Sequence, residues 1–259
     1  MTDPDDLDGL AARLRSAGIV FAEEEAALLA EAAWGDALDR LVERRRAGEP
    51  LEPLLGWAAF DGLRVPVDPG VFVPRRRTEL LAHEAARLAR PGAVVLDLCC
   101  GTGAVGLAVA TRVPGIELHA ADVEPAAVAN AARTVAGVGG TVHAGDLFAA
   151  LPDALRGRFD VVAVNAPYVP TGRIADMPRE AREFEPHVAL DGGDDGLDVH
   201  RRVAAGVREW LAPGGAVLIE TGRTQAAWTA LLLEGAGLAA SVVADDEIDG
   251  TVAIGAAPR

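Results

Sequence analysis

The tetrapeptide Asn165-Ala166-Pro167-Tyr168 follows the apolar run Phe159–Val164 and holds the residues best suited to bind a planar amine. Tyr168 is the only tyrosine in the chain, and Asn165 is one of two asparagines. An Asn side-chain oxygen and the next backbone carbonyl can accept both hydrogens of an –NH2 group, and an aromatic ring can cover its face. Because open α/β sheets bind ligands at the carboxyl ends of their strands, the tetrapeptide is a candidate catalytic site. A simple β-turn is the alternative interpretation.

A glycine-rich loop follows an earlier apolar run, Val94–Leu98. Its GxGxxG pattern consists of Gly101, Gly103 and Gly106, and Asp122 ends the next expected strand. Glycines let the backbone approach a ligand closely, and an acidic residue at this distance hydrogen-bonds ribose hydroxyls. The pattern suits a dinucleotide or S-adenosylmethionine, and a loop that binds no ligand is also compatible with it.

Two aspartates favour S-adenosylmethionine over a dinucleotide. Asp97 lies at a strand end, where a carboxylate suits an ammonium group and repels a pyrophosphate. Asp146 and Leu147 follow the third expected strand, where they can bind an adenine amino group and cover its ring. Asp122 and Asp146 could each be ordinary loop residues, but they follow consecutive strand ends. The expected cofactor-binding residues are Asp97, Cys99, Gly101, Thr102, Gly103, Asp122, Val123, Asp146, Leu147 and Asn165.

The elements that must position these residues alternate between strand and helix. This alternation predicts an α/β fold with a doubly wound, mostly parallel, seven-stranded Rossmann-like sheet. Helices are expected from the glycine-rich loop to about residue 111, over 125–135, over 197–211 and around 228–232. The expected strands cover residues 94–98, 116–121, 141–144, 159–164, 216–220, 238–243 and 251–254.

The chain before the sheet is expected to form a small helical domain and a linker. Residues 1–55 carry amphipathic patterns, and Asp3-Pro4 is a suitable helix start. This domain is either a packing cap or a surface that selects a macromolecular substrate. Residues 56–73 indicate a β-hairpin linker, and residues 74–259 form the α/β domain, whose first helix Thr78 can cap.

Composition limits the partners. Half of the residues are apolar, and the net charge is −15. The chain contains no lysine, so every basic residue except histidine is an arginine. Nucleic-acid-binding proteins normally carry a basic stripe, so this charge disfavours nucleic acid. The arginine runs 44–46 and 75–77 are interpreted as solvated faces.

The two cysteines and five histidines indicate no metal site. Cys99 and Cys100 are adjacent and cannot build a metal cage alone, and the histidines lack HxxxH or HxH spacing. The acidic start of the chain does not have the pattern of a signal peptide. No uncharged apolar run reaches the roughly 18 residues that indicate a membrane span. A cytoplasmic protein is therefore expected.

Together, these motifs resemble a class I S-adenosylmethionine-dependent methyltransferase that acts on a planar nitrogen. The flanking segments narrow the resemblance to the PrmC/HemK protein-(glutamine-N(5)) methyltransferases. These segments are Glu49-Pro50-Leu51, Leu55-Gly56, Gly70–Arg75, Thr78-Glu79, Phe184-Glu185-Pro186, Ala189-Leu190 and Gly192–Leu197.

The resemblance implies methyl transfer to a glutamine side chain of another protein, in the best-known members the Gly-Gly-Gln loop of a peptide chain release factor. It implies catalytic roles for Asn165 to Tyr168. Arg75, Glu185 and Pro186 are the expected substrate-binding residues, although Arg75 and Glu185 could instead form a structural ion pair.

Four positions depart from the family pattern and suggest a divergent branch. Ala166 gives NAPY in place of NPPY, and Cys99 stands where glycine is usual. Arg76-Arg77 replace Pro-Asp, and Thr251 replaces an arginine.

Other functions also fit part of the pattern. A methyltransferase acting on an exocyclic amino group of a nucleic-acid base could use the same tetrapeptide, but would have to flip the base and bind phosphates. A non-catalytic S-adenosylmethionine-binding module is a second alternative. A nicotinamide-dependent dehydrogenase is disfavoured by Asp97.

Overall fold

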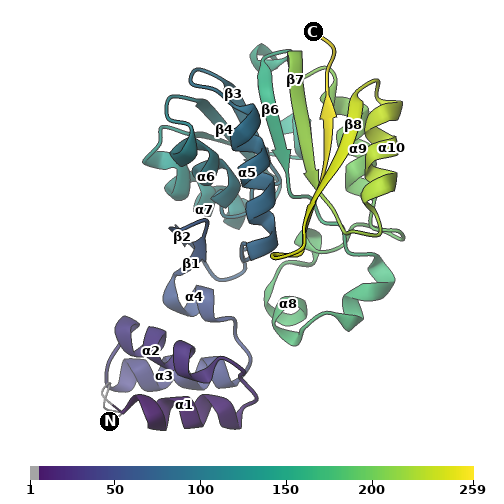
Figure 1. Cartoon of the computed structure of the whole chain (residues 1–259). Coiled ribbons are helices and arrows are strands. Elements are labelled where there is room, and N and C mark those ends of the chain that lie inside the picture. Colours follow the sequence, from purple (N-terminus) through teal and green to yellow (C-terminus); the bar gives the residue numbers. More distant parts are fainter. Residues whose placement is uncertain (1–5) are drawn as a thin grey trace.

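A seven-stranded sheet forms the centre of the computed structural model, which describes residues 6–259 (Figure 1). The strand order is β5-β4-β3-β6-β7-β9-β8. Only β9 runs antiparallel to its neighbours, β7 and β8. The doubly wound, mostly parallel sheet is therefore confirmed. The strands are β3 Val94–Leu98, β4 Glu117–Asp122, β5 Thr141–Ala144, β6 Phe159–Val164, β7 Leu211–Glu220, β8 Ala239–Asp245 and β9 Gly250–Ala256.

The order of the strands reverses between β3 and β6. The chain passes from β3 outward through β4 and β5, and then returns to β6 on the other side of β3. The register pairs Leu98 with Val164, so the loops after β3 and β6 leave the sheet side by side. Such a switch point opens a crevice at the carboxyl ends of the strands.

Helices cover both faces of the sheet (Figure 1). One face packs against α5, α6 and α7, and the other against α9 and α10. Because the central strands are buried on both faces, they are nearly continuous apolar runs. The helices are α5 Glu79–Leu88, α6 Ala104–Arg112, α7 Pro125–Ala136, α9 Asp198–Val207 and α10 Ala226–Gly235.

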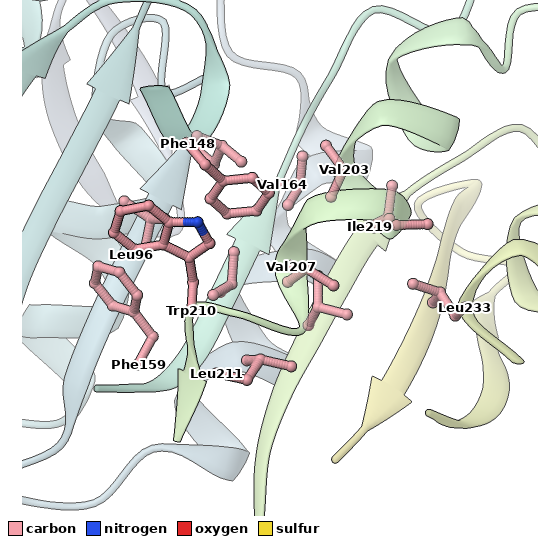
Figure 2. Packing of buried hydrophobic residues seen from close by; sticks show 14 of the residues in the cluster. Leu96, Phe148, Phe159, Val164, Val203, Val207, Trp210, Leu211, Ile219 and Leu233 are labelled. Carbon is pink, nitrogen blue, oxygen red and sulfur yellow. The ribbon is translucent and has the colours of Figure 1, made fainter. Parts of the chain in front are cut away.

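The core on the α9 side is built around three aromatic rings (Figure 2). Phe148 stacks on Trp210 with ring centroids 5.8 Å apart, and Phe159 lies 6.4 Å from the same indole. Val203 and Val207 of α9 complete this layer (Figure 2). These contacts fix α9 above the strands whose ends form the crevice.

The N-terminal helices form a separate apolar cluster below the sheet (Figure 1). Helix α1 begins after Asp6, whose carboxylate accepts a hydrogen bond from Gly9 N at 2.9 Å. The predicted start at Asp3-Pro4 lies outside the described residues. The hairpin β1–β2 turns at Asp61-Gly62, as predicted, with positive φ at both residues. Bounds are α1 Leu7–Ser16, α2 Ala22–Ala32, α3 Asp36–Arg46, α4 Leu51–Leu55, β1 Trp57–Phe60 and β2 Leu63–Pro66.

Several element boundaries differ from the predictions. The helix expected over 197–211 ends at Val207, and β7 begins at Leu211 with a register irregularity opposite Phe159 and Val161. The expected helix cap at Thr78 makes no capping hydrogen bond. Short helices unmarked by strong periodicity were not predicted. They are α8 Arg179–Phe184, η1 Arg76–Thr78, η2 Leu147–Ala150, η3 Asp153–Leu155, η4 Thr171–Asp176 and η5 His187–Ala189.

No helix within residues 6–259 is long and apolar enough to cross a membrane.

Candidate active site

A cavity of about 390 Å³ lies at the carboxyl ends of β3, β4, β5 and β6. Its wall combines the two motifs that the sequence singled out, the glycine-rich loop and the tetrapeptide after β6. Gly103, Glu185 and Pro186 are predicted site residues that do not line it. The predicted residues on the wall are Arg75, Asp97, Cys99, Gly101, Thr102, Asp122, Val123, Asp146, Leu147, Asn165, Ala166, Pro167 and Tyr168.

Asp97 places a buried carboxylate on the cavity wall. Its Oδ2 accepts a hydrogen bond from Gly106 N at 2.8 Å, and its Oδ1 has no hydrogen-bond partner among residues 6–259. Burial, with a smaller contribution from Asp122, raises the pKa of Asp97 to about 8. An unpaired, buried acceptor fits the ammonium group of S-adenosylmethionine, which would supply its missing partner.

Asp122 fixes the glycine-rich loop to the end of β4. Its Oδ2 accepts from Gly101 N at 2.8 Å, and its Oδ1 accepts from Glu124 N at 2.9 Å. Each carboxylate oxygen has a second lone pair, so both can still accept ribose hydroxyls.

Three residues of the glycine-rich loop, Cys99, Gly101 and Gly103, have positive φ angles. Gly103 has φ +77°, and a Cβ there would lie 3.3 Å from the side chains of Ala131 and Val135. The structure therefore gives Gly103 a role in packing α6 on α7, away from the cavity wall. Cys99 has φ 59°, a left-handed conformation that costs a non-glycine residue roughly 1–2 kcal/mol.

The expected adenine end of the cavity contains an ion pair that the sequence did not reveal. Asp146 Oδ2 accepts from Arg202 Nη2 at 2.5 Å, and both residues line the cavity. Arg202 is the second of two adjacent arginines on α9, and it belongs to no motif of the sequence. Leu147 lies beside this pair and is half-buried.

The tetrapeptide is held by residues from two other elements. Asn165 Nδ2 lies 3.5 Å from Thr78 Oγ1, so its Oδ1 is left for another donor. The Tyr168 hydroxyl donates to Glu220 Oε1 at 3.0 Å, and burial raises the pKa of Tyr168. Thr78 and Glu220 were not predicted as site residues: Thr78 was interpreted as a helix cap within the Thr78-Glu79 segment, and Glu220 belongs to no motif.

The other end of the cavity is more apolar. Arg75 lines it and lies over the Phe72 ring, 5.0 Å from the centroid. Glu185 accepts from Arg75 Nη2 at 2.5 Å and from Val73 N at 3.3 Å, and its side chain is 2% exposed. Glu185 therefore forms an ion pair with Arg75 but does not line the cavity itself, as the alternative of a structural ion pair predicts. Unpredicted apolar residues complete this end: Met177, Val188 and Leu190.

Among residues 6–259, no group of three or more His, Cys, Asp or Glu side chains is arranged to hold a metal ion.

The sheet order, the glycine-rich loop after its first parallel strand and the acidic residues at the next strand ends define a class I S-adenosylmethionine-dependent methyltransferase. The family model of the methyltransferase small domain matches residues 62–180. A solved methyltransferase from Pyrococcus furiosus shares the fold, with a TM-score of 0.58 and 16% identity over 76% of this chain and 90% of that one.

Two relatives identify the family more narrowly. A release factor glutamine methyltransferase of Geobacter sulfurreducens is 40% identical over 72% of this chain and 65% of its own length. The one of Bradyrhizobium diazoefficiens is 35% identical over 88% of this chain and 85% of its own length. The chain belongs to the release factor glutamine methyltransferase family, which confirms the PrmC/HemK resemblance.

Proposed function

We propose that this protein transfers a methyl group from S-adenosylmethionine to the side-chain amide nitrogen of a glutamine in another protein, a peptide chain release factor. The observation that carries the proposal is the shared cavity. Asn165, Ala166 and Tyr168 line the same cavity as Asp97 and Asp122. The names of the two relatives supply the expected substrate.

The chemistry requires positioning more than acid–base catalysis. An amide nitrogen is a poor nucleophile because its lone pair is delocalised into the carbonyl group. When bound, S-adenosylmethionine supplies the electrophilic methyl group. Asn165 Oδ1 and the Ala166 carbonyl would accept the two amide hydrogens and orient the nitrogen, and orientation can contribute several kcal/mol. The same acceptors favour the positive charge that develops on nitrogen.

Tyr168 would cover the plane of the amide. Its hydroxyl is already bonded to Glu220, so the ring is held in place before the substrate arrives. The amide proton becomes acidic only after methyl transfer, so the proposal assigns no general base.

The proposal extends to the remaining parts of the chain. The helical part, residues 1–55, would recognise the protein substrate, residues 56–73 would link it to the rest, and residues 74–259 would carry the chemistry. Because a release factor acts in the cytoplasm, we expect this protein to be cytoplasmic as well. A net charge of −15 supports a protein substrate over a nucleic acid.

The test is methyl transfer from labelled S-adenosylmethionine to a purified release factor, with mass spectrometry to locate the label. Label on the glutamine of its Gly-Gly-Gln loop, absent when that glutamine is replaced by alanine, is the expected result. Label on a glutamine of a different protein would support the proposed reaction but overturn the proposed substrate. Label on DNA or RNA alone would overturn both.

A further inference from the structure

Gln225 lies directly before α10, at the position where a side chain can cap its own helix. It makes no such capping hydrogen bond. Its Nε2 instead donates to the Tyr168 carbonyl at 3.0 Å and to the Asp195 carbonyl at 2.9 Å. A single amide group at the start of α10 therefore joins the last residue of the tetrapeptide to the segment that precedes α9.

The segment before α9 packs closely against the main chain of the tetrapeptide. A Cβ at Gly192 would lie 2.8 Å from the Pro167 carbonyl oxygen. A Cβ at Gly196 would lie 2.3 Å from both the Tyr168 carbonyl oxygen and Gln225 Nε2. Gly196 also has φ +76°, a conformation that favours glycine. The two segments are therefore in direct contact, and the Gln225 amide is part of that contact.

The main chain of Gln225 is fixed on both sides. Its N–H donates to Gly222 O at 2.8 Å, and its carbonyl accepts from Thr229 N at 2.9 Å. The segment on the far side is also held, because the Asp195 carboxylate accepts from Arg201 Nη1 of α9 at 3.0 Å. The Gln225 side chain thus connects two fixed parts of the molecule, and it can fix the tetrapeptide relative to both.

Gln225 and Glu220 hold different parts of Tyr168. The Tyr168 hydroxyl donates to Glu220 Oε1 at 3.0 Å, which fixes the tip of the side chain. Among residues 6–259, Gln225 is the only side chain that hydrogen-bonds a main-chain atom of the tetrapeptide. The ring on the cavity wall is therefore held at its hydroxyl by one contact and at its backbone by the other.

We propose that Gln225 is a positioning residue, which holds the tetrapeptide in the conformation that binds the glutamine amide of the substrate. This inference rests on the proposed function, because it concerns how the Ala166 carbonyl and the Tyr168 ring face that amide. Pro167 lies between these two groups, and its fixed φ transmits a displacement of the Tyr168 carbonyl to Ala166. A misplacement of about 1 Å can cost about 100-fold in rate.

Gln225→Met and Gln225→Glu test the proposal as a pair. Methionine removes both donated hydrogen bonds without adding a charge. Ionised glutamate has nearly the shape of glutamine, but it places a carboxylate, which only accepts hydrogen bonds, against two carbonyl oxygens. We expect kcat for glutamine methylation to fall about tenfold in Gln225→Met and further in Gln225→Glu. A role in packing alone predicts the opposite order, because glutamate preserves the shape.

Binding of S-adenosylmethionine separates positioning from general damage. Its dissociation constant, measured by calorimetry, should stay within a few-fold of wild type in both variants, because Asp97 and Asp122 are unchanged. Thr224→Val is the matched control: Thr224 precedes Gln225 and is exposed, so kcat should not change. Three results would overturn the proposal: wild-type kcat in Gln225→Met, a smaller loss in Gln225→Glu than in Gln225→Met, or a loss of cofactor affinity as large as the loss of kcat.

A second measurement does not depend on the substrate. Tyr168 is the only tyrosine in the chain, so tyrosine labelled with 13C at its carbonyl gives a single labelled main-chain signal. The chemical shift of a carbonyl carbon depends on the hydrogen bonds that its oxygen accepts. The signal should therefore shift in Gln225→Met and Gln225→Glu and stay in place in Thr224→Val. An unmoved signal would overturn the proposal, and a moved signal in a protein that methylates no glutamine would overturn only the proposed function.

Discussion

Arg45 Nη1 donates a hydrogen bond to Glu180 Oε1 at 2.6 Å and so joins residues that are far apart in the sequence. Arg45 belongs to α3 of the helical N-terminal part, and Glu180 to α8 in the segment after the tetrapeptide (Figure 1). The same segment places Met177 and Val188 on the cavity wall. The position of the helical part is thereby coupled to the end of the cavity where we expect the substrate.

Glu180→Ala should weaken the use of a protein substrate without affecting the cofactor. Arg45 keeps its bidentate partner Glu25, so the fold should remain intact. We expect the KM for the release factor to rise several-fold, with kcat and the dissociation constant of S-adenosylmethionine unchanged, as measured by initial rates and calorimetry. Glu183→Ala on the same helix is the control, because Glu183 pairs only with exposed Arg179 in the described structure. Equal KM values for the two variants would contradict the coupling.

Arg45→Met should destabilise the protein strongly. It would leave the carboxylate of Glu25, whose side chain is 11% exposed, buried without its cation. Removal of one partner of a buried pair costs about 3–5 kcal/mol in the free energy of unfolding. Urea titration measures this loss, and Arg46→Ala, at a more exposed position in the same run, should cost far less. A second substitution, Glu25→Gln, should recover part of the loss, and no recovery would assign the effect to packing.

The affinity for S-adenosylmethionine should depend on the ionisation of Asp97. Burial raises the pKa of Asp97 to about 8, and an ammonium group binds the ionised carboxylate. A proton and the cofactor therefore compete, and affinity should fall up to about tenfold per pH unit below pH 8. Calorimetry across pH 6–9 measures this slope. Asp97→Asn should bind weakly with a flat profile, and an unchanged slope in that variant would assign it to another group.

The same group makes stability depend on pH. The Asp97 pKa is 3.8 in the unfolded chain and about 8 in the fold, so between these values the folded state binds more protons. Its contribution is fully present below pH 3.8 and is lost as pH rises towards 8, by at most about 1.4 kcal/mol per pH unit. Asp97→Asn should make this decline less steep in the cofactor-free protein, and burial of Glu185 and Glu220, which also raises the pKa of each, accounts for the decline that remains. An equally steep decline in the variant would show that Asp97 does not contribute to it.

The sequence predicts the sheet and the loops at its carboxyl edge because both leave local signals. Buried parallel strands are continuous apolar runs, and a switch point brings the ends of two such strands together. Asp97, Asp122 and Asn165 can therefore be assigned to one site from the sequence alone. The structure also explains why the departure at Cys99 matters. Cys99 stands where the family usually has glycine, and its backbone has the left-handed conformation that favours glycine.

Residues that act through others left no such signal. Glu220 and Thr78 are ordinary residues of a strand end and a helix start, and only the β6–β7 register places Glu220 beside Asn165. Thr78 has the sequence pattern of a helix cap, but its hydroxyl is used by Asn165. Arg202 and Met177 reach the cavity from elements whose orientation depends on tertiary packing.

Asn165→Ala should separate methyl transfer from cofactor binding. The variant loses the acceptor that would orient the glutamine nitrogen, and loss of one such group typically costs about 10²–10³-fold in kcat. The dissociation constant of S-adenosylmethionine, measured by calorimetry, should stay within a few-fold because Asp97 and Asp122 are unchanged. Asn130→Ala is the matched control: its side chain bonds to Asp68 N and Pro66 O at 2.9 Å, and it should lower thermal stability while the remaining folded protein keeps its kcat. Near-normal turnover by Asn165→Ala would contradict the orienting role of Asn165. The cavity could then no longer be interpreted as an amide methylation site.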